Sequence, residues 1–420
     1  MSVEPKAILR ALADAAIAAA DPNTRVPAVL PPAPERAIVL GAGKASAAMA
    51  KSLENAWPDA DLSGLVVTRY GYEVACDKIE VVGASHPVPD DAGRDAAARI
   101  LQIADAAGQD DLVIALISGG GSALLTAPAS GITFEDKQEV NRLLLRSGAD
   151  IGEMNTVRKH LSAIKGGRLA EASYPTKLIT VLISDVPGDD PAVIASGPTV
   201  PDPSTFADAR AVIEKYNMPV PGSVRLHLDA AENETPKPGD KFFERTSLVF
   251  AAKPDKSIAA AADVAKAHDL HVIDLGDQLE GEARDLGRAH AKIALACKNG
   301  EGVKSTPCVI LSGGETTVTM SGNGRGGRNT EYLLGVADGL GGAEGVFAVA
   351  CDTDGIDGSE DNAGAFIDPT TIARADAAGL SVAAALESND AYTLFQNIGD
   401  LLITGPTFTN VNDFRAILVT

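Results

Sequence analysis

Two glycine-rich segments that follow apolar runs carry residues whose types and spacing suit the binding of an anion. The first places Gly43 and Lys44 after residues 37–40, and the second follows residues 112–117. Glycines let backbone N–H groups approach a ligand closely, and the start of a following helix favours negative charge. We therefore predict anion-binding loops that contain Gly43, Lys44, Ser118, Gly119, Gly120, Gly121 and Ser122. The plainer interpretations are a solvated lysine at Lys44 and a mobile loop at residues 118–122.

The segment around Lys44 lacks parts of two nucleotide-binding motifs. Ser46 replaces the third glycine of G-x-G-x-x-G, and the next predicted strand ends in Arg69 and Tyr70 instead of the acidic residue that holds a ribose. Ala45 stands where a Walker A loop has Ser or Thr. Lys44 is therefore predicted to act as a point charge for a phosphate or a carboxylate, with little support for NAD.

A literal G-x-G-x-x-G occurs at residues 322–327 and leads into a predicted helix. It also carries Arg325 and Arg328, and arginine suits planar, bidentate recognition of phosphate. The pattern predicts phosphate contacts at Gly322, Gly324, Gly326, Gly327 and Arg328, and the alternative is an exposed flexible loop.

An internal echo links the two halves of the chain. An apolar run leads into Ser-Gly-Gly at Ser118 and again at Ser312, where Gly313, Gly314 and Glu315 follow. Two α/β domains with similar strand-end loops would place those loops across a shared cleft, since ligands bind outside the carboxyl ends of such strands. The alternative is that Ser-Gly-Gly is a common tight turn.

A basic island stands out in residues 155–168. It contains Arg158, Lys159, Lys165 and Arg168, with no acidic residue between Glu153 and Glu171. Such an island could bind a carboxylate or a polyphosphate, and it could equally be a solvated helix face.

Acidic clusters follow two predicted strands. One is Asp185 to Asp190, including Asp189, and the other contains Asp352, Asp354 and Asp357. Clustered carboxylates can hold Mg²⁺, and a single one can accept a hydroxyl proton. We expect a metal or base role for one cluster, while turn formation explains the other.

Histidine and cysteine add few candidates. His86 lies before a proline-rich turn and could contact a ligand or simply close the turn. No G-x-S-x-G nucleophile elbow occurs. The four cysteines are far apart, which excludes a zinc site or a disulfide framework and fits a reducing cytosol, so a cytoplasmic location is expected.

The elements that must position these residues alternate between strands and helices. Apolar runs at residues 37–40, 65–68, 79–82, 112–117 and 178–183 predict buried parallel strands in a doubly wound α/β fold. A polar stretch at 230–240 predicts a linker, after which the pattern restarts. We expect domains at residues 1–235 and 236–420, the second ending in a strand at 400–404 and a short tail.

Length, composition and charge narrow the class of protein. The chain has 420 residues, 45% of them hydrophobic, which is enough for more than one folded core. Its 36 basic and 57 acidic side chains give a net charge of −21, which argues against nucleic acid or an anionic membrane as partner. No apolar run approaches the roughly 20 residues of a membrane span.

Taken together, these loops resemble the class II glycerate kinases, which combine a Rossmann-like N-terminal domain with a C-terminal MOFRL domain. The resemblance runs nearly from end to end. It is carried by GAGKA at 41–45, HPVPD at 86–90, SGGGSALL at 118–125, NTVRKHLSAIKGGRLA at 155–170, ISDVPGDDPAVIASGPTVPDPSTF at 183–206, LSGGETTVT at 311–319, GNGRGGRNTEYLL at 322–334 and DTDGIDG at 352–358.

The resemblance implies a fold, a reaction and two substrates. It implies a three-layer α/β/α N-terminal domain and a smaller α/β C-terminal domain with its MOFRL region at about residues 306–415. It further implies ATP- and Mg²⁺-dependent phosphorylation of D-glycerate to 2-phosphoglycerate in a cleft between the domains, by a chain that could form a homodimer.

By the same resemblance, Lys44 and Arg325 become the leading catalytic residues. Asp189 is the candidate for orienting or deprotonating the glycerate hydroxyl, and Asp352, Asp354 or Asp357 would hold Mg²⁺. Arg158 or Lys165 could hold the glycerate carboxylate. We expect the five cations Lys44, Arg158, Lys165, Arg325 and Arg328 to form a positive cleft.

Two points qualify the resemblance. Lys253 stands where the family leads us to expect an asparagine, so a ligand contact at that position is in doubt. Members of the family have also been labelled hydroxypyruvate reductases, and NAD(P)H-dependent reduction is the alternative reaction. The incomplete dinucleotide fingerprint argues against it.

Overall fold

The computed structural model describes residues 4–420, which divide into two compact units. The N-terminal unit comprises residues 22–184 and 189–251, and the C-terminal unit comprises the described residues up to Asp21, residues 185–188 and residues 252–420. The boundary expected at residue 235 therefore lies inside the N-terminal unit, whose sheet continues to β6 (Thr246–Ala252).

The N-terminal unit is built on a six-stranded sheet in the order β3-β2-β1-β4-β5-β6. Adjacent strands from β3 to β5 pair in parallel. This is the order of a Rossmann fold, and it agrees with the predicted doubly wound architecture. The other strands are β1 (Arg36–Ala42), β2 (Asp61–Arg69), β3 (Glu80–Ala84), β4 (Leu112–Ile117) and β5 (Lys177–Ile183).

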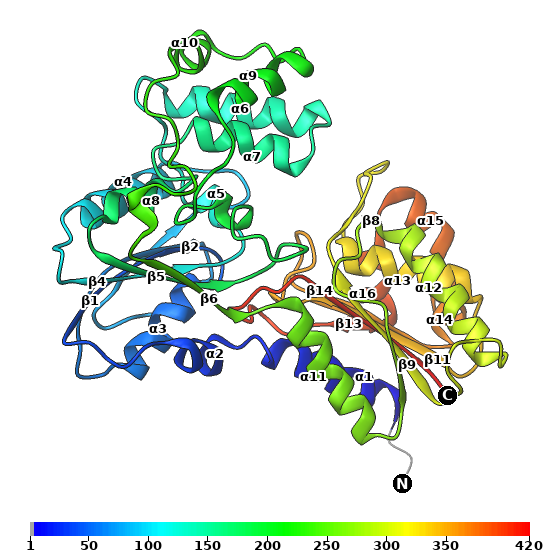
Figure 1. Ribbon diagram of the computed structural model, residues 1–420. Helices are drawn as coiled ribbons and strands as arrows, with labels where there is room; N and C mark the ends of the chain where they lie inside the picture. The colour runs from blue at the N-terminus through cyan, green and yellow to red at the C-terminus, as the bar shows by residue number, and fades with distance from the viewer. Residues whose placement is uncertain (1–3) are drawn as a thin grey trace. The chain divides into compact units, whose positions relative to one another are not determined.

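Helices cover both faces of this sheet (Figure 1). Helices α2 and α3 lie on one face, and α4, α5 and α8 lie on the other. Their bounds are α2 (Pro22–Val29), α3 (Ser46–Ala56), α4 (Asp91–Asp105), α5 (Gly121–Leu124) and α8 (Arg168–Ser173), with 3₁₀ turns at η1 (Ile194–Ser196) and η2 (Lys241–Phe243).

Four further helices of this unit pack on one another around a core of their own. That core includes Val140, Leu144, Val157 and Phe206. The helices are α6 (Phe134–Ser147), α7 (Ile151–His160), α9 (Phe206–Lys215) and α10 (Gly222–Ala230). Side-chain caps fix where three of them begin, because Thr133, Asp150 and Thr205 accept hydrogen bonds from the first turns of α6, α7 and α9. The sequence pattern did not separate this cluster from the sheet.

The C-terminal unit has a second six-stranded sheet, in the order β13-β12-β11-β14-β9-β7. Only β7 and β9 are parallel among its pairs, and β9, β14, β11, β12 and β13 pair antiparallel. The strands are β7 (His271–Asp274), β9 (Cys308–Gly314), β11 (Val346–Asp352), β12 (Gly364–Ile367), β13 (Leu401–Leu402) and β14 (Asp413–Val419). A small parallel pair joins β8 (Gly281–Glu282) to β10 (Thr316–Thr317).

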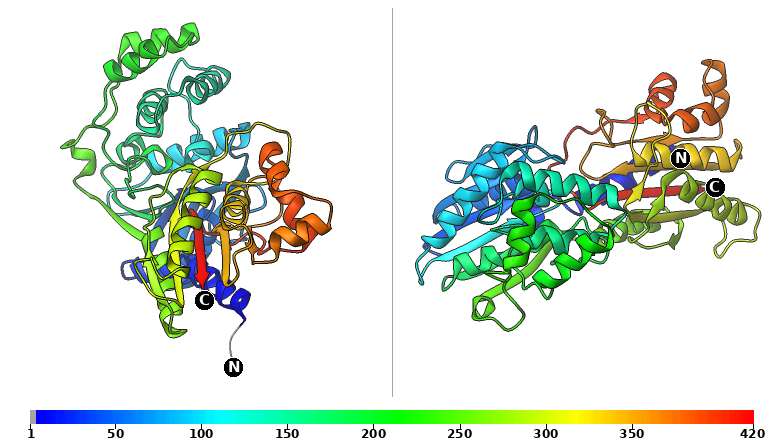
Figure 2. Two further views of the ribbon diagram at one scale, coloured as in Figure 1. Left: turned by 90° about the vertical axis from the view of Figure 1, so that its right-hand side faces the viewer. Right: turned by 90° about the horizontal axis from the view of Figure 1, so that it is seen from above.

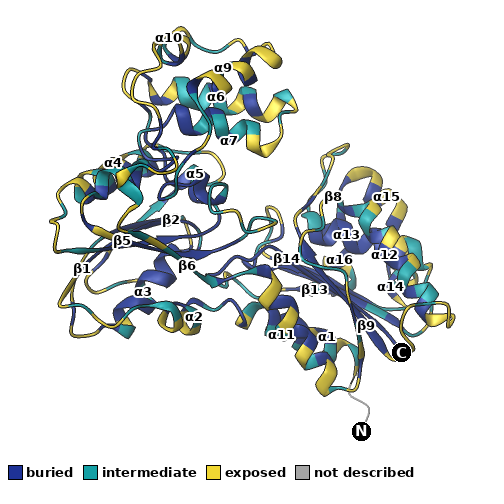
Figure 3. Ribbon diagram, viewed as in Figure 1, coloured by how far each residue is buried: buried dark blue, intermediate teal, exposed yellow. Residues whose placement is uncertain are grey.

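The end of the chain corrects the prediction of a short tail. Residues 413–419 form β14, which is buried throughout and lies between β9 and β11 (Figures 2 and 3). The strand was missed because Asp413 and Arg415 interrupt its apolar pattern. Both side chains are buried and form an ion pair of 2.6 Å between Arg415 Nη2 and Asp413 Oδ2.

Helices enclose the second sheet as a middle layer (Figure 1). Helix α1 supplies Leu9, Leu12, Ala13 and Ala16 to a core shared with α11 and one sheet face, and α12 and α13 cover the other face. The bounds are α1 (Pro5–Ala18), α11 (Pro254–Ala267), α12 (Ala283–Lys298), α13 (Arg328–Leu340), α14 (Thr371–Ala377), α15 (Val382–Ser388) and α16 (Ala391–Ile398). Within residues 4–420, no helix combines the length and apolar character needed to cross a bilayer.

A buried histidine between α12 and α13 predicts a pH dependence of stability. His290 Nδ1 lies 2.8 Å from the Tyr332 hydroxyl, and burial together with the charge of Arg415 lowers the His290 pKa to about 4. The unfolded chain binds the proton at about pH 6.5, so stability falls as the pH drops from 6.5 to 4, by about 2–3 kcal/mol. Denaturant unfolding at several pH values should show this loss.

The variant His290→Asn should weaken the dependence over that pH window. The exposed His271 provides the matched control, because His271→Asn should leave the slope unchanged. An unaltered slope in His290→Asn would contradict the prediction.

Candidate active site

The glycine-rich loops of the N-terminal unit meet at the point where its strand order reverses. The loop after β1 and the loop after β4 leave neighbouring strands whose connections run in opposite directions, and such switch points bind ligands in open α/β sheets. The loops are in direct contact, because Lys44 N–H donates to the Gly119 carbonyl at 2.8 Å and Ala45 N–H donates to Ser118 Oγ at 3.0 Å. A Cβ atom on Gly43 would lie 2.1 Å from Ser118 Oγ, so only glycine fits there.

The loop after β4 is the part of this site with unused backbone donors. In the described chain, the N–H groups of Gly119, Gly120 and Ser122 have no protein acceptor, although Gly121 N–H donates to the Ser118 carbonyl. Gly120 is left-handed, with φ of 80°, and a Cβ on it would meet the His86 ring at 3.1 Å and Lys44 Cγ at 3.3 Å. Lys44 and His86 therefore flank a backbone segment that can donate to an anion.

The loop after β1 uses its N–H groups inside the protein. Gly43 N–H donates to the Val67 carbonyl and Ser46 N–H to the Gly43 carbonyl. The buried Ser46 hydroxyl bonds the carbonyls of Gly43 and Val67 at 2.8 and 2.6 Å. The serine that breaks the dinucleotide fingerprint thus ties α3 to β2.

The basic island is largely buried and is not a solvated helix face. Lys165 is 2% exposed, and its Nζ donates to the Ser122 carbonyl at 2.7 Å. Arg158 donates from Nε and Nη2 to Asn141 Oδ1 at 3.0 and 2.8 Å. Lys159 pairs with Asp202 at 3.4 Å, so its charge is compensated within the unit.

Two polar residues beside the loop were not among the predicted site residues. Ser196 Oγ lies 2.9 Å from Ser122 Oγ and donates to Asn155 Oδ1 at 3.1 Å. Ala195 and Ser196 both have left-handed backbones, with φ of 52° and 61°. A left-handed non-glycine pair is strained and often marks a functional segment. The sequence gives no sign of it, since only Gly197 in that turn would suggest such a conformation.

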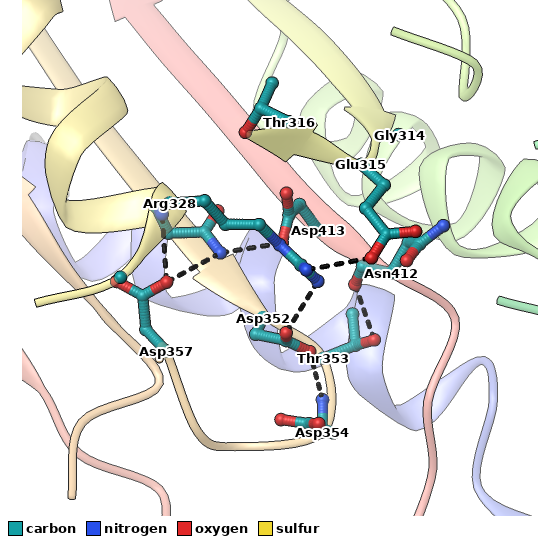
Figure 4. A network of polar contacts seen from close by, with 12 residues as sticks. Gly314, Glu315, Thr316, Arg328, Asp352, Thr353, Asp354, Asp357, Asn412 and Asp413 are labelled. Atoms are coloured by element: carbon teal, nitrogen blue, oxygen red, sulfur yellow. Dashed lines mark hydrogen bonds and ion pairs between the residues drawn. The ribbon is translucent and has the colours of Figure 1, made fainter. Parts of the chain in front are cut away.

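In the C-terminal unit, Arg328 is held by three carboxylates (Figure 4). Its Nε lies 2.7 Å from Asp413, Nη1 lies 3.0 Å from Glu315, and Nη2 lies 2.8 Å from Asp352. Burial disfavours the charge on Arg328, but these carboxylates outweigh it and raise the Arg328 pKa above its ordinary value. Asp413 and Asp352 lie opposite each other on β14 and β11, so the arginine bridges the two strands.

Asp357 occupies the N-terminus of α13 (Figure 4). Its carboxylate accepts hydrogen bonds from Asn329 N–H at 2.9 Å, and from Thr330 N–H and Thr330 Oγ1 at 2.8 Å each. Burial raises the Asp357 pKa, while these bonds act in the opposite direction. An internal carboxylate therefore fills the helix start where the sequence pattern suggested a bound phosphate.

The glycines of residues 322–327 pack closely against residues 388–390. Gly322 N–H and Gly324 N–H donate to Asn389 Oδ1 and the Ser388 carbonyl. A Cβ on Gly324 would lie 2.6 Å from the Asn389 backbone. Gly327 is equally close to Asp357. These contacts give the glycines a packing role, and nucleotide contacts at Gly322, Gly324, Gly326 and Gly327 stay a prediction.

Arg325 protrudes from this segment. Its guanidinium lies 4.8 Å from the Tyr392 ring centroid, and Nη1 is 3.4 Å from Glu360. The side chain is half exposed and is more accessible to a ligand than that of Arg328, which is 24% exposed.

The second Ser-Gly-Gly sequence differs from the first in structure. Gly313 and Gly314 belong to β9, where they pair with Phe414 and Asp413 of β14. Arg415 Nη1 donates to the Gly313 carbonyl at 3.0 Å. The two similar sequences therefore differ in structure, because the first is a turn after a strand and the second lies within a strand. Glu315 comes directly after that strand and contacts Arg328.

A cavity of about 210 Å³ lies in the C-terminal unit beside Arg328. It brings predicted residues together with others that the sequence did not single out, of which Val318 and Met320 add apolar surface. The lining residues are Val318, Met320, Gly326, Gly327, Arg328, Glu331, Asp352, Gly358 and Asn389.

In the second acidic cluster, Asp352 and Asp354 have side-chain oxygens of the kind that bind Mg²⁺. Asp352 is the last residue of β11 and Asp354 lies in the turn that follows, and both offer carboxylate oxygens, the ligands that Mg²⁺ prefers. Asp352 Oδ1 accepts Asp354 N–H at 3.0 Å. Among residues 4–420, no three His, Cys, Asp or Glu side chains are grouped as a complete metal site, so substrate oxygens and water would have to complete the coordination.

In the first acidic cluster, Asp189 has a left-handed backbone, with φ of 54°.

Substitution of Asp357 tests its helix-anchoring role. An asparagine at this position presents an NH₂ group to the N–H donors of α13, so Asp357→Asn should lower the free energy of unfolding by about 1–3 kcal/mol. Denaturant unfolding measures the change, and a Ser359→Ala variant at an exposed position of the neighbouring loop serves as control. An Asp357→Asn protein of unchanged stability would argue against the anchor and return attention to a metal role.

Comparison with known protein families matches both parts of the chain. Residues 8–229 match DUF4147, a domain family of unknown function, and residues 308–413 match the MOFRL family. A crystal structure of a glycerate kinase from Thermotoga maritima superposes with a TM-score of 0.90 at 38% identity, covering 99% of both chains.

Two curated relatives carry different names. A protein of Agrobacterium vitis with the provisional name hydroxypyruvate reductase is 54% identical over 420 residues, covering 99% of this chain and 95% of its own. The D-glycerate 2-kinase of Thermotoga maritima is 40% identical over 380 residues, covering 90% of this chain and 89% of its own. With a DUF4147 domain followed by a MOFRL domain, the chain belongs to the class II glycerate kinase family.

Proposed function

We propose that the chain transfers the γ-phosphoryl group of ATP to D-glycerate and forms 2-phosphoglycerate. The observation that carries this proposal is the anion-binding segment at the β1/β4 switch point. There the N–H groups of Gly119, Gly120 and Ser122 have no acceptor within residues 4–420, and Lys44 lies beside them. Kinase relatives that cover most of the chain support the same reaction.

Phosphoryl transfer requires positioning and charge neutralisation more than covalent help from the protein. In the proposed reaction, the glycerate hydroxyl oxygen forms a bond to the γ-phosphorus, and the bond from that phosphorus to the bridging oxygen of ADP breaks. Asp189 receives the hydroxyl proton. Lys44 and Arg325 neutralise the charge on the transferred group, and Arg158 or Lys165 binds the glycerate carboxylate.

A magnesium ion fits this proposal at Asp352 and Asp354. When bound, it would neutralise phosphate charge. Asp357 would have to release the hydrogen bonds from α13 to reach the metal, and Asp352 would likewise have to release Asp354 N–H or Arg328. The cleft between the domains stays a prediction.

Product identification tests the reaction directly. Incubation with D-glycerate, ATP and Mg²⁺ should give the phosphorus NMR signal of 2-phosphoglycerate together with ADP. Formation of 3-phosphoglycerate would overturn the regiochemistry alone. Absence of any phosphorylated acid would overturn the kinase proposal.

Removal of a charge that acts in the transition state should slow turnover. We expect Lys44→Met and Arg325→Met each to reduce kcat by about 100-fold or more, with little change in thermal stability. Steady-state kinetics at saturating ATP and glycerate measure this effect. Arg10→Met, on the exposed face of α1, is the control, and two variants with nearly normal kcat would refute these roles.

Reduction of hydroxypyruvate by NAD(P)H is the second candidate, favoured by the name of the Agrobacterium vitis relative. The local geometry favours the kinase, because the loop after β1 uses its own N–H groups and Arg69 ends β2 where an acidic residue would hold a ribose. Turnover of hydroxypyruvate with NADH, and none of glycerate with ATP, would reverse the choice.

A further inference from the structure

Three cations gather in the N-terminal unit without a carboxylate partner. They are Lys137, Arg158 and Lys165, and each contacts neutral oxygens. Lys137 Nζ donates to the carbonyls of Ala127 and Leu161 at 3.1 and 3.2 Å, while Arg158 donates to Asn141 and Lys165 to the Ser122 carbonyl. Within residues 4–420, no acidic side chain lies within ion-pair distance of any of the three. We refer to them as the cation cluster.

The helical hairpin of α6 and α7 brings the cluster together. Lys137 and Asn141 lie one turn apart on α6, and Asn141 holds the guanidinium of Arg158 on α7. Lys165 follows α7 in the turn whose backbone is fixed by Ser162 Oγ. Residues from two helices and a turn thus bring three positive charges into one region.

Burial makes the cluster costly when no anion is bound. Desolvation lowers the Lys137 pKa to about 7, with a further contribution from Arg158. Desolvation also lowers the Lys165 pKa well below its ordinary value, and the charges of Lys137 and Arg158 act in the same direction. Buried charges are normally paired, so a bound anion would supply the missing compensation.

The cluster adjoins the anion-binding loop. Lys165 contacts the carbonyl of Ser122, whose N–H is one of the unused donors. Gln138, the neighbour of Lys137, donates to the Pro89 carbonyl at 2.9 Å, in the turn that follows His86. The cluster is therefore next to the loop whose unused N–H groups carry the proposed function, and its three side chains lie outside that loop.

We propose that Lys137, Arg158 and Lys165 together bind the carboxylate of the acceptor and thereby select 2-hydroxy acids over neutral polyols. This inference rests on the proposed function for its substrate, and it adds Lys137 as a specificity-determining residue. Lys165 is buried, and Lys137 and Arg158 are partly buried. A site built from such cations favours a small anion, and arginine can bind a carboxylate in a bidentate fork.

The test compares two acceptors in the full-length enzyme. The variants are Lys137→Met, Arg158→Met and Lys165→Met, which keep the apolar stems, and the control is Arg146→Met at an exposed position of α6. Each cluster variant should lower kcat/KM for D-glycerate by about 10-fold or more, mainly through KM. The kcat/KM for the uncharged D-glyceramide should stay within about 2-fold. A structural role would lower both values together and would overturn the proposal.

A binding measurement separates this proposal from the kinase reaction. Calorimetric titration with D-glycerate in the absence of ATP should show binding to the wild type and the control, and at least 10-fold weaker binding to each variant. A second titration with inorganic phosphate tests whether the cluster binds anions in general. Equal affinities for phosphate and D-glycerate would indicate such a general anion site and would contradict the proposal. If glycerate binding depends on the cluster but no turnover is seen, the proposed carboxylate site is supported and the proposed kinase function is refuted.

Discussion

The C-terminal unit depends on one buried carboxylate, Asp413. It accepts hydrogen bonds from Arg328 and Asn329 at the start of α13, and it pairs with Arg415 two residues along the same strand. A buried charge is stable only when such partners surround it, and removal of one partner is far more costly than an exposed ion pair would suggest. Because β14 lies in the middle of the sheet, these contacts fix α13, the loop that carries Arg325 and the end of β11 relative to one another.

Three similar glycine-rich sequences have three different physical functions. At residues 322–327, glycine allows close packing against residues 388–390, and the following helix is capped by Asp357. At Gly313 and Gly314, it lies in a strand whose carbonyls accept hydrogen bonds from Arg415. Of the three, the loop after β4 is the one that leaves several backbone N–H groups without an acceptor among the described residues. What distinguishes them is the presence of an internal acceptor, which the local sequence does not reveal.

Local sequence pattern predicted the first sheet well because its strands are apolar throughout and end in glycine-rich turns. It failed at β14, where Asp413 and Arg415 pair with each other and also depend on partners more than 80 residues away. The same limit applies to the site. Lys44 and the loop at 118–122 could be chosen from residue type alone, but Lys137 lies in an ordinary charged helix segment and becomes notable only when Arg158 and Lys165 are brought beside it.

The contacts of the cations in the two units explain how a chain with a net charge of −21 can bind an anion. The five cations expected to form a positive cleft are not equivalent. Arg328 is neutralised by three carboxylates, while Arg158 and Lys165 have no carboxylate partner in the part of the chain that the structure describes. An acidic surface repels small anions at long range, so affinity for them must come from places where desolvated cations or free N–H groups outweigh that field. The described contacts concentrate such groups in the N-terminal unit. Arg325 is half exposed on the loop at residues 322–327, so the cation proposed to act in phosphoryl transfer is open to solvent.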